Sequence, residues 1–504
     1  MTNPLYDALV APLASRDTAS LIDATGNEIS GKALHRMAME YASALTGLGV
    51  KPGDRLAVQI EKSPQALALY LGAVAAGVVF LPLNTAYTAD EIDYFVGNSG
   101  AALLVGDPAR ADALREVAAR NGAQFQTLDG AGQGGLSDLA AAAEDFTPVE
   151  RRPDDLAAIL YTSGTTGRSK GAMLSQSNLL SNAEVLVREW RFTDADVLLH
   201  ALPIFHTHGL FVASNVLLLA GGTMVFLPGF KLDQVISWLP RSTSMMGVPT
   251  FYTRLLDDPR FTRDLVGHMR LFTSGSAPLL AETHRQFEDR TGHRILERYG
   301  MTETNMNTSN PYEGDRRAGT VGMPLPGVEV KITDPATGAT LPEGEPGMIE
   351  VRGPNVFKGY WEMPEKTREE LRENGFFITG DIGVIDADGY VSIVGRQKDL
   401  IITGGYNVYP KEIELILDEQ PGVLESAVIG VPHPDFGEGV VAILVPESNE
   451  SPDLEAIRSA LGQSLAKFKQ PKHIALVAEL PRNTMGKVQK NLLRNEMSEL
   501  FAGS

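Results

Sequence analysis

Residues 156–171 read Leu-Ala-Ala-Ile-Leu-Tyr-Thr-Ser-Gly-Thr-Thr-Gly-Arg-Ser-Lys-Gly, an apolar run followed at once by a polar segment. The run 156–160 predicts a buried strand. The two loop glycines let backbone N–H groups approach phosphate oxygens, while hydroxyl and cationic side chains add donors and charge. The segment therefore predicts a phosphate-binding loop whose candidate ligands are Thr162, Ser163, Gly164, Thr165, Thr166, Gly167, Arg168 and Lys170. It is not a Walker loop, because Gly167 is followed by Arg-Ser-Lys and not by Lys-Ser/Thr.

Apolar segments of strand length alternate with helical patterns on both sides of this loop. Before it, strands are predicted at 56–60, 78–81, 102–105 and 125–128, with helices opened by Ser63-Pro64 and spanning 109–120. After it, strands are predicted at 197–202, 223–227, 245–248, 270–273 and 294–298, with a helix at 279–290. This alternation predicts an α/β fold with parallel sheet and helices on both faces. Residues 130–135 and the alanine run after them are expected to form an exposed connector.

Four of these strands are followed by polar loops. The loops are His206-Thr-His-Gly, Gly247-Val-Pro-Thr, Ser274-Gly-Ser-Ala-Pro and Tyr299-Gly-Met-Thr-Glu. Ligands of open α/β sheets lie at the carboxyl ends of the strands, so we expect the loops to form the walls of one site. In the last loop, the Glu303 carboxylate could hold Mg²⁺ against nucleotide phosphates.

The sequence pattern changes after about residue 320, where predicted short strands alternate with Gly, Pro and Asp turns. Asp388-Gly389 between alternating apolar segments predicts a β-hairpin. We therefore expect an N-terminal domain at 1–395, containing a small β subdomain at about 320–395. A smaller α+β domain is expected at 396–504, with strands at 426–431, 440–445 and 473–477.

Composition limits the possible functions. The 504 residues carry a net charge of −19, which argues against nucleic acid or an anionic membrane as the main partner. The absence of cysteine excludes disulfides, thiolate metal sites and thiol catalysis, and fits a cytoplasmic enzyme. The N-terminus lacks a secretory signal pattern, and the apolar runs 66–83 and 209–228 contain Gly and polar interruptions that predict buried elements, not membrane spans.

Residues 161–171 resemble the signature of the acyl-adenylate-forming (AMP-binding) superfamily, Ser-Gly-Thr-Thr-Gly-x-Pro-Lys-Gly, with Ser169 in place of the usual proline. The likeness runs from about residue 30 to 495. It implies that Thr302 contacts the α-phosphate, that Thr162 and Glu303 serve the metal, and that Tyr299 stacks on adenine. It also implies nucleotide contacts for Ser276, Asp381 and Arg396, and a catalytic role for His206. We expect His206 to be a pocket wall or orienting group and not a metal ligand, because the sequence shows no third ligand cluster.

The C-terminal part resembles the same superfamily. Lys487 matches its catalytic lysine, whose ammonium would bridge the acid carboxylate and the α-phosphate, while Lys490 is expected to be a solvated helix residue. Lys398 matches the hinge between the two domains, and Gly404 and Gly405 match the loop near the coenzyme A tunnel. Because that loop has the acyl-CoA synthetase form and the chain ends at Ser504 without a carrier domain, free coenzyme A is the expected thiol.

Within the superfamily the chain most resembles malonyl-CoA synthetases, in 166–170, 203–211, 274–285 and 297–309. The resemblance implies ATP-dependent ligation of malonate to coenzyme A, with AMP, pyrophosphate and Mg²⁺; methylmalonate or acetate is the alternative acid. A second, buried carboxylate needs a cation, for which the candidates are His206, His208, Arg254, Arg270 and Arg285. We favour Arg285, because guanidinium grips carboxylate bidentately. Lys487 is also a target on which a protein acetyltransferase could act. A P-loop kinase or ATPase, or a non-catalytic nucleotide-binding protein, stays open.

Overall fold

The computed structural model describes residues 3–143, 145–162, 169–404, 406–447, 452–483 and 487–502. The chain divides into two compact units, which are described separately below. Unit 1 contains residues 1–330 and 351–377, and unit 2 contains residues 331–350 and 378–504. The predicted domain boundary at 395 and 396 stays a prediction.

A six-stranded sheet in unit 1 carries the predicted phosphate loop. In spatial order its strands are β6 (Gln124–Thr127), β5 (Leu103–Gly106), β3 (Arg55–Gln59), β4 (Val79–Pro82), β7 (Leu156–Thr162) and β8 (Lys170–Ser175). All neighbours are parallel except β7 and β8. The antiparallel strand β8 was not predicted, and the predicted phosphate loop therefore connects two antiparallel strands.

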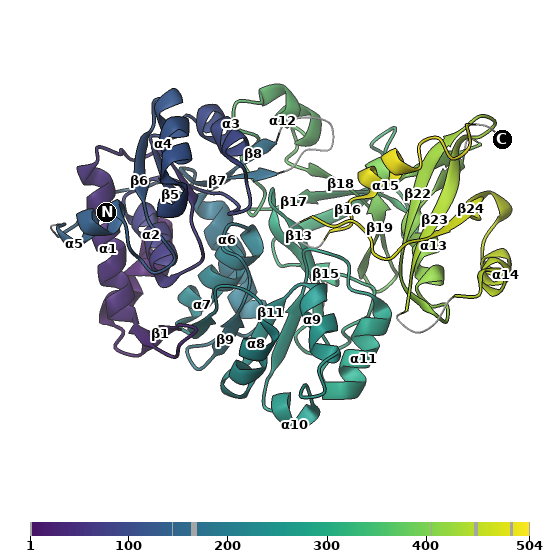
Figure 1. Ribbon diagram of the computed structural model, residues 1–504, viewed down its shortest axis with the longest axis horizontal. Helices are drawn as coiled ribbons and strands as arrows, with labels where there is room; N and C mark the ends of the chain where they lie inside the picture. Colours follow the sequence, from purple (N-terminus) through teal and green to yellow (C-terminus); the bar gives the residue numbers. More distant parts are fainter. Residues whose placement is uncertain are drawn as a thin grey trace. The chain divides into compact units, whose positions relative to one another are not determined.

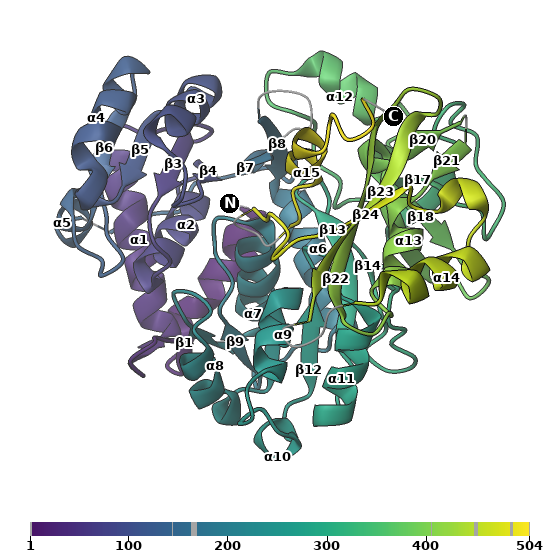
Figure 2. The ribbon, with the colours of Figure 1, turned by 45° about the vertical axis from the view of Figure 1, so that its right-hand side comes forward.

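Helices cover both faces of this sheet (Figure 2). On one face α3 (Ala89–Ser99) and α4 (Ala111–Arg120) pack on Val79 and Leu81. On the other, Tyr70 of α2 (Pro64–Ala75) meets Phe80 at a ring distance of 5.3 Å, and α1 (Gly31–Gly47) packs against α2. The Ser63 hydroxyl caps α2 by accepting from the Ala66 N–H at 3.1 Å, with proline at the first helical position, as Ser63-Pro64 predicts. The alanine run is not a connector: residues from Gly135 to Ala141 form α5, which buries Leu136 and Ala140.

The second sheet of unit 1 has nine strands. Their spatial order is β15 (Met323–Pro324), β14 (Asn305–Ser309), β13 (Leu296–Met301), β12 (Leu271–Ser274), β11 (Ser244–Gly247), β9 (Val197–His200), β10 (Thr223–Phe226), β1 (Ala19–Ile22) and β2 (Glu28–Ser30). The strands from β13 to β1 are parallel, so their carboxyl ends share one edge.

Helices also flank this sheet (Figure 1). Phe287 of α11 (Ala281–Thr291), Tyr252 of α9 (Pro249–Leu256) and Val235 of α8 (Leu232–Trp238) belong to one apolar core with the sheet residues Met245 and Phe272. The remaining helices of unit 1 are α6 (Gln176–Glu189), α7 (Asn215–Ala220), α10 (Arg263–Val266) and α12 (Pro364–Glu370). A π-helical turn, His208–Ser214, precedes α7.

Unit 2 is built on antiparallel strands. A four-stranded sheet, most of which belongs to it, has the order β16 (Glu329–Thr333), β17 (Gly347–Arg352), β18 (Phe377–Ile385) and β19 (Val391–Arg396). The β18–β19 hairpin turns at Gly389 with φ of +86°, which confirms the Asp388-Gly389 prediction. A five-stranded sheet contains β21 (Tyr406–Val408), β20 (Ile401–Thr403), β23 (Gly437–Pro446), β22 (Val423–His433) and β24 (His473–Leu476). The α-helices of unit 2 in the described residues are α13 (Pro410–Leu417), α14 (Leu454–Ser464) and α15 (Lys490–Glu496).

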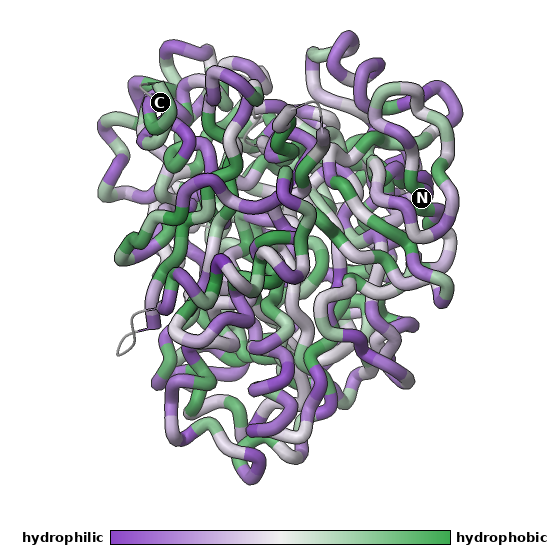
Figure 3. The backbone as a smooth tube through the Cα atoms, turned by 90° about the vertical axis from the view of Figure 1, so that its right-hand side faces the viewer, coloured by the Kyte–Doolittle hydropathy of each residue, from purple (hydrophilic) through white to green (hydrophobic). Residues whose placement is uncertain are grey.

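The predicted α/β class is confirmed. Hydrophobic and hydrophilic segments alternate along the backbone (Figure 3). In the part of the chain that the structure describes, no helix has both the length and the apolar character needed to cross a bilayer.

Candidate active site

The four predicted loops meet at the carboxyl edge of the nine-stranded sheet. The Gly275 N–H donates to the Gly247 carbonyl at 3.3 Å, which joins the loops after β11 and β12. The Ser276 hydroxyl lies 3.2 Å from His208 Nδ1, and the Thr207 hydroxyl donates to Asn305 Oδ1 at 2.7 Å. The loop after β9 is therefore bound both to the loop after β12 and to the segment that follows β13.

Two non-glycine residues of this edge have left-handed backbone conformations. Ser276 has φ of +71° and Asn305 has φ of +51°. Such conformations cost about 1–3 kcal/mol each and cluster at functional sites, where surrounding contacts hold them in place. The hydrogen bonds of Ser276 and Asn305 to the His206–Gly209 loop supply such contacts, so both residues are fixed before any ligand arrives.

Glu303 lies in a buried cluster of polar side chains. Its side chain is 5% exposed, and burial is the main cause that raises the pKa of its carboxyl group. The Tyr360 hydroxyl lies 3.0 Å from Glu303 Oε1 and 2.5 Å from Glu370 Oε2. Glu370 in turn accepts from Lys170 Nζ at 3.0 and 3.2 Å, and this ammonium lies 4.2 Å from the Tyr360 ring centre. The side chain of the predicted phosphate ligand Lys170 is thus linked to that of Glu303 through two residues that the sequence did not indicate.

The backbone explains how Tyr360 reaches this place. The Trp361 N–H donates to the Gly171 carbonyl at 2.8 Å, and Met173 exchanges backbone hydrogen bonds with Gly359 and Lys358. The segment 358–361 therefore runs along the outer edge of β8, next to Lys170. The Phe357 N–H also donates to the Glu303 carbonyl at 2.8 Å, so one segment contacts both the phosphate hairpin and the β13 loop.

The phosphate loop itself is described only at its ends. Thr162 closes β7 and pairs in register with Lys170, the first residue of β8. The predicted ligands Ser163, Gly164, Thr165, Thr166, Gly167 and Arg168 lie outside the described residues. On the β13 side, Tyr299 is 7% exposed and Thr302 is partly exposed.

A buried lysine is connected to the His206–Gly209 loop through His200. Lys62 Nζ donates to the carbonyls of His200 and Leu202 at 2.7 and 3.0 Å and lies 2.9 Å from His200 Nδ1. On its other side, His200 Nε2 lies 2.9 Å from the Gly209 carbonyl. Burial lowers the pKa of both side chains well below their usual values. The partly exposed His206 accepts from the His208 N–H at 3.3 Å through its Nδ1.

The cations considered for the acid pocket occupy different positions. Arg285, in the middle of α11, has a side chain 52% exposed and an ion pair with Glu282 at 3.0 Å. Arg254 is exposed on α9. Arg270 precedes β12, at the opposite edge of the sheet from the loops, and binds Asp196 through two nitrogens at 2.7 and 2.9 Å. Arg270 is therefore a structural residue and no longer a candidate.

Arg298 is a further cation at this edge that sequence reasoning missed. It is 3% exposed on β13, and its guanidinium packs against Gly275 so closely that a side chain at 275 would overlap it. The signal was present in the sequence, since Glu297-Arg298 precedes Tyr299, but nothing in it distinguishes a buried arginine from an exposed one.

In unit 2, two predicted nucleotide contacts are partners. Asp381 on β18 is 3% exposed, pairs in register with Arg396 on β19, and accepts from its Nε at 2.7 Å. Lys398 is exposed in the short helical turn after β19, and partial desolvation lowers its pKa. Gly404 has φ of +57°, while Gly405 lies outside the described residues.

The two C-terminal lysines differ. Lys487 is exposed, and its backbone N–H donates to Asn483 Oδ1 at 3.0 Å. Lys490 is not the solvated residue expected from the sequence: its side chain is 17% exposed and forms an ion pair with Glu414, which is 9% exposed. Glu414 also accepts from the Val428 N–H at 2.9 Å, so Lys490 holds α15 to α13 and β22.

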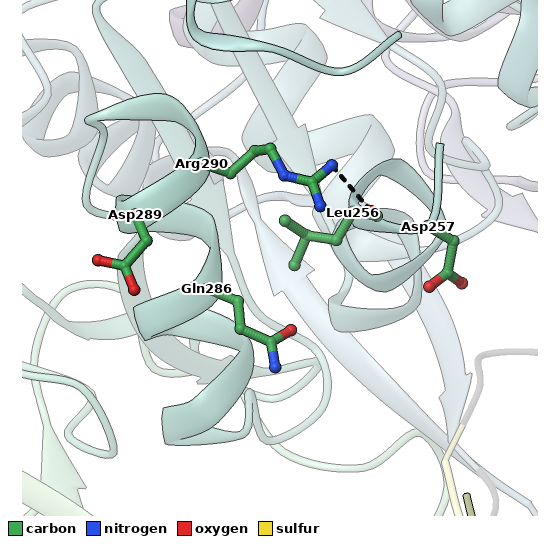
Figure 4. Close-up of a pocket in the computed structure, with 5 residues that line it drawn as sticks. All are labelled: Leu256, Asp257, Gln286, Asp289 and Arg290. Atoms are coloured by element: carbon green, nitrogen blue, oxygen red, sulfur yellow. Dashed lines mark hydrogen bonds between the residues drawn. The ribbon is translucent and has the colours of Figure 1, made fainter. Parts of the chain in front are cut away.

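A surface pocket lies between the ends of α9 and α11 (Figure 4). Its lining residues are Leu256, Asp257, Gln286, Asp289 and Arg290. Arg290 Nη1 donates to the Leu256 carbonyl at 3.1 Å and so closes one side of it. Both helices begin at the carboxyl edge of the sheet, so this pocket, near their far ends, is separate from the loops.

Comparison with known proteins identifies the family of the chain. Residues 11–361 match the AMP-binding enzyme family, and residues 412–487 match the AMP-binding enzyme C-terminal domain. A malonate–CoA ligase of Arabidopsis thaliana is 36% identical over 90% of this chain and 79% of its own length, and a sulfoacetate–CoA ligase of Cupriavidus necator is 35% identical over 97% and 98%. The crystal structure of ATP-bound MatB from Rhodopseudomonas palustris has a TM-score of 0.97 and 57% identity over 99% of this chain and 100% of that one. This chain belongs to the AMP-binding enzyme family.

Proposed function

We propose that this chain ligates malonate to coenzyme A at the expense of ATP, through a malonyl-AMP intermediate. The similarity to the malonate–CoA ligase of Arabidopsis thaliana carries this proposal, because it extends over 90% of the chain at 36% identity. Methylmalonate or acetate is the alternative acid, since one methyl group changes binding by only about 1–3 kcal/mol.

In the first step, a carboxylate oxygen of malonate attacks the α-phosphorus of ATP, and pyrophosphate leaves. Two anions approach each other, so positive charge near the reacting atoms lowers the barrier. Lys487 would supply that charge, with Thr302 at the α-phosphate and His206 orienting the acid. The phosphate hairpin, which begins at Thr162 and ends at Lys170, would hold the β- and γ-phosphates.

The nucleoside would be held by three further groups. We assign adenine stacking to Tyr299, a nucleotide contact to Ser276, and the ribose hydroxyls to Asp381. Arg396 would then orient Asp381, as supported by their 2.7 Å ion pair.

The residues around Glu303 fit magnesium. Among the described residues no group of three or more His, Asp or Glu side chains could form a metal cage. A single buried carboxylate fits an ion whose other ligands are phosphate oxygens and water, which is how magnesium is usually bound beside nucleotides. Glu303 and Thr162 would hold the ion, which when bound would neutralise phosphate charge.

In the second step, the sulfur of coenzyme A attacks the acyl carbon, the thiol proton is lost, and AMP leaves. We assign the rotation of a C-terminal domain between the steps to a hinge at Lys398, and the pantetheine tunnel to the loop of Gly404 and Gly405. Arg285 would meet the non-reacting carboxylate of malonate at the α11 side of the site. Because its partner Glu282 is exposed, a ligand carboxylate could replace that pair at small cost.

The decisive assay is product analysis with ATP, Mg²⁺, coenzyme A and a panel of short acids. We expect AMP, pyrophosphate and malonyl-CoA with malonate, and lower rates with acetate. Release of ADP would identify a kinase or ATPase instead. If AMP forms readily with acetate or methylmalonate and hardly at all with malonate, the alternative acid is correct.

The role of Lys487 can be tested separately. Lys487→Ala should lower pyrophosphate formation from malonate and ATP by at least 100-fold and leave thioester formation from supplied malonyl-AMP within about threefold. Acetylation of the exposed Lys487 by a protein acetyltransferase in the cytoplasm would remove the same charge. Equal loss of both half-reactions would argue against a role of Lys487 in the first step alone. Lys490→Ala is the matched control, which should lower stability but affect both half-reactions alike.

A further inference from the structure

Lys62 lies where the two sheets of unit 1 come together. It follows β3 at the carboxyl edge of the six-stranded sheet and precedes α2. Its hydrogen-bond partners belong to the other sheet, because His200 is the last residue of β9 and Leu202 follows it. The Lys62 side chain is 6% exposed, so this polar contact between the two sheets is closed to solvent.

The ammonium group of Lys62 has three N–H donors, and three acceptors surround it. The carbonyls of His200 and Leu202 lie 2.7 and 3.0 Å from Nζ, and His200 Nδ1 lies 2.9 Å from it. The centre of the Phe226 ring is 4.2 Å from the same nitrogen, which is within the range of a cation–π contact. A buried ammonium is costly unless acceptors receive its protons, and here each proton has one. These contacts direct the Lys62 side chain to a single position.

His200 connects Lys62 to the loop that follows β9. Its Nε2 lies 2.9 Å from the Gly209 carbonyl, which can only accept, so Nε2 carries the ring proton. A second ring proton, on Nδ1, would point at the Lys62 ammonium. Burial and the charge of Lys62 both lower the pKa of His200, so the imidazole is neutral. Nδ1 is then the acceptor that the third N–H of Lys62 requires.

The two side chains together hold both ends of one short loop. The Leu202 carbonyl, bound to the lysine, precedes residues 203–208, and the Gly209 carbonyl, bound to the histidine, follows them. The two ends also contact each other, because a side chain at position 209 would overlap the Pro203 carbonyl. Between these ends lies His206, to which the proposed function assigns the orientation of the acid.

We propose that Lys62 is a positioning residue for acid binding, which with His200 holds residues 203–208 against the turn between β3 and α2 so that His206 meets the acid in the first step. This inference rests on the proposed function, because it requires that the loop contacts the acid. The phosphate hairpin has its own support in residues 358–361, which run along β8. Binding of the acid should therefore depend on Lys62, and binding of ATP should not.

The first test is Lys62→Met, which keeps the length of the side chain and removes its three donors. Arg16→Met is the matched control, because Arg16 also donates to backbone carbonyls, those of Ala19 and Gly222, but at the amino edge of the nine-stranded sheet. We expect Lys62→Met to lower kcat/KM for malonate about 100-fold, mainly through a higher KM, since a displacement near 1 Å has an effect of about that size. The Kd for ATP, measured without acid, should not change, and Arg16→Met should change neither quantity.

Restoring the ammonium separates positioning from stability. A lysine that served stability alone would, when replaced, reduce the amount of folded enzyme and so lower the apparent kcat with the KM for malonate unchanged. The chain contains no cysteine, so Lys62→Cys introduces a single thiol. Alkylation of this thiol with 2-bromoethylamine in denaturant, followed by refolding, gives an S-aminoethyl side chain of nearly the length of lysine, whereas bromoethane gives an uncharged S-ethyl side chain. Compared with wild type refolded in the same way, the S-aminoethyl form should recover the KM for malonate and the S-ethyl form should not.

Hydrogen exchange gives a readout that does not depend on turnover. Within the loop region, the Leu210 N–H donates to the His206 carbonyl at 3.0 Å. In Lys62→Met the amides of residues 204–210 should exchange about tenfold faster than in the wild type, because local opening no longer breaks the Lys62 contacts. In Arg16→Met the same amides should keep the wild-type rates.

Two outcomes would overturn the proposal: a KM for malonate in Lys62→Met equal to that of the wild type, or equal recovery with the S-aminoethyl and S-ethyl side chains. If Lys62→Met does not fold, Lys62→Gln decides, because its amide removes the charge and keeps two donors; an unchanged KM for malonate in Lys62→Gln would contradict the proposal. A wild type that never releases AMP would refute the proposed ligase, and faster exchange of 204–210 in Lys62→Met would then still support Lys62 as the residue that holds the loop. Unchanged exchange in that case would refute both.

Discussion

Changing Glu370 to glutamine removes one negative charge from the partner of Lys170 and leaves the shape of the side chain nearly unchanged. Glu370 holds the Lys170 ammonium at 3.0 and 3.2 Å and also accepts from Tyr360 and Lys366. If Lys170 binds phosphate, ATP must compete with this resident carboxylate for it. The variant should therefore bind ATP more tightly than the wild type does.

The size of the effect follows from the exposure of the pair. At 3.0 Å and an effective dielectric constant near 20, the Coulomb energy is about 5 kcal/mol. Rehydration of the released charges cancels most of it, and fully exposed pairs contribute only about 0–1 kcal/mol. The Lys170 and Glu370 side chains are 17% and 22% exposed, so we expect a net contribution above that of surface pairs, about 1–2 kcal/mol. That corresponds to an approximately 5- to 30-fold lower Kd for ATP.

Titration calorimetry with ATP and Mg²⁺, without the acid so that no adenylate forms, measures this Kd. Glu369→Gln is the matched control, because Glu369 is one residue away on α12, is 64% exposed and pairs with Lys366. Its Kd should stay within twofold of the wild-type value. Weaker ATP binding by Glu370→Gln would mean that Glu370 positions Lys170 for the phosphates. Equal tightening in both variants would point to net charge instead of the pair.

Two further predictions concern stability. Asp196→Asn should destabilise unit 1 by about 2–4 kcal/mol, because it leaves the partly buried Arg270 without its bidentate partner, and kcat/KM should not change. Arg270 and other hydrogen-bond donors lower the pKa of Asp196, so the pair stabilises the fold above the ordinary carboxyl pKa near 4. The difference in unfolding free energy between Asp196→Asn and the wild type, measured by calorimetry, should vanish as pH falls through the folded pKa. A difference that stays constant with pH would contradict this. Burial raises the pKa of Asp418 to about 6, so its ionisation opposes folding as pH rises from about 4 to 6. Asp418→Asn should therefore be more stable than the wild type by up to about 3 kcal/mol at pH 8 and equal to it at pH 4, and equal Tm values at both pH values would refute this.

Local signals in the sequence predicted the elements that depend on local chemistry. Ser63-Pro64 marks a helix start because a hydroxyl cap and a proline satisfy the first turn whatever packs around it. Asp388-Gly389 marks a hairpin because glycine adopts the positive φ that the turn requires. The carboxyl-edge site followed from four polar loops after parallel strands, and the contacts of Ser276 and Thr207 confirm that these loops meet.

Tertiary contacts decided what the sequence could not predict. Lys170 and Glu370 are 200 residues apart, and the edge of β8 that brings them together has no local marker. Lys490 looks like a solvated helix residue until Glu414, 76 residues earlier, is placed beside it. The alanine run after Gly135 resembles a connector because alanine has little side chain to bury, yet alanine also has the highest intrinsic helix propensity, and here the helix forms.

The cations of the candidate site are of two kinds, those that already pair with a carboxylate of the protein and those that do not. Lys170 and Arg285 have resident carboxylates, Glu370 and Glu282, so a ligand gains from either cation only the difference between its own anion and the displaced one. Buried Arg298 has two nitrogens without a hydrogen-bond partner in the described part of the chain, so an anion that meets them displaces no resident carboxylate. The exchangeable pair of Lys170 suits a cosubstrate that must enter as ATP and leave as AMP, and the exposed pair of Arg285 lets a ligand carboxylate replace Glu282. A chain with a net charge of −19 can therefore bind anionic substrates selectively, because selectivity depends on where counter-charge is missing and not on the overall sign.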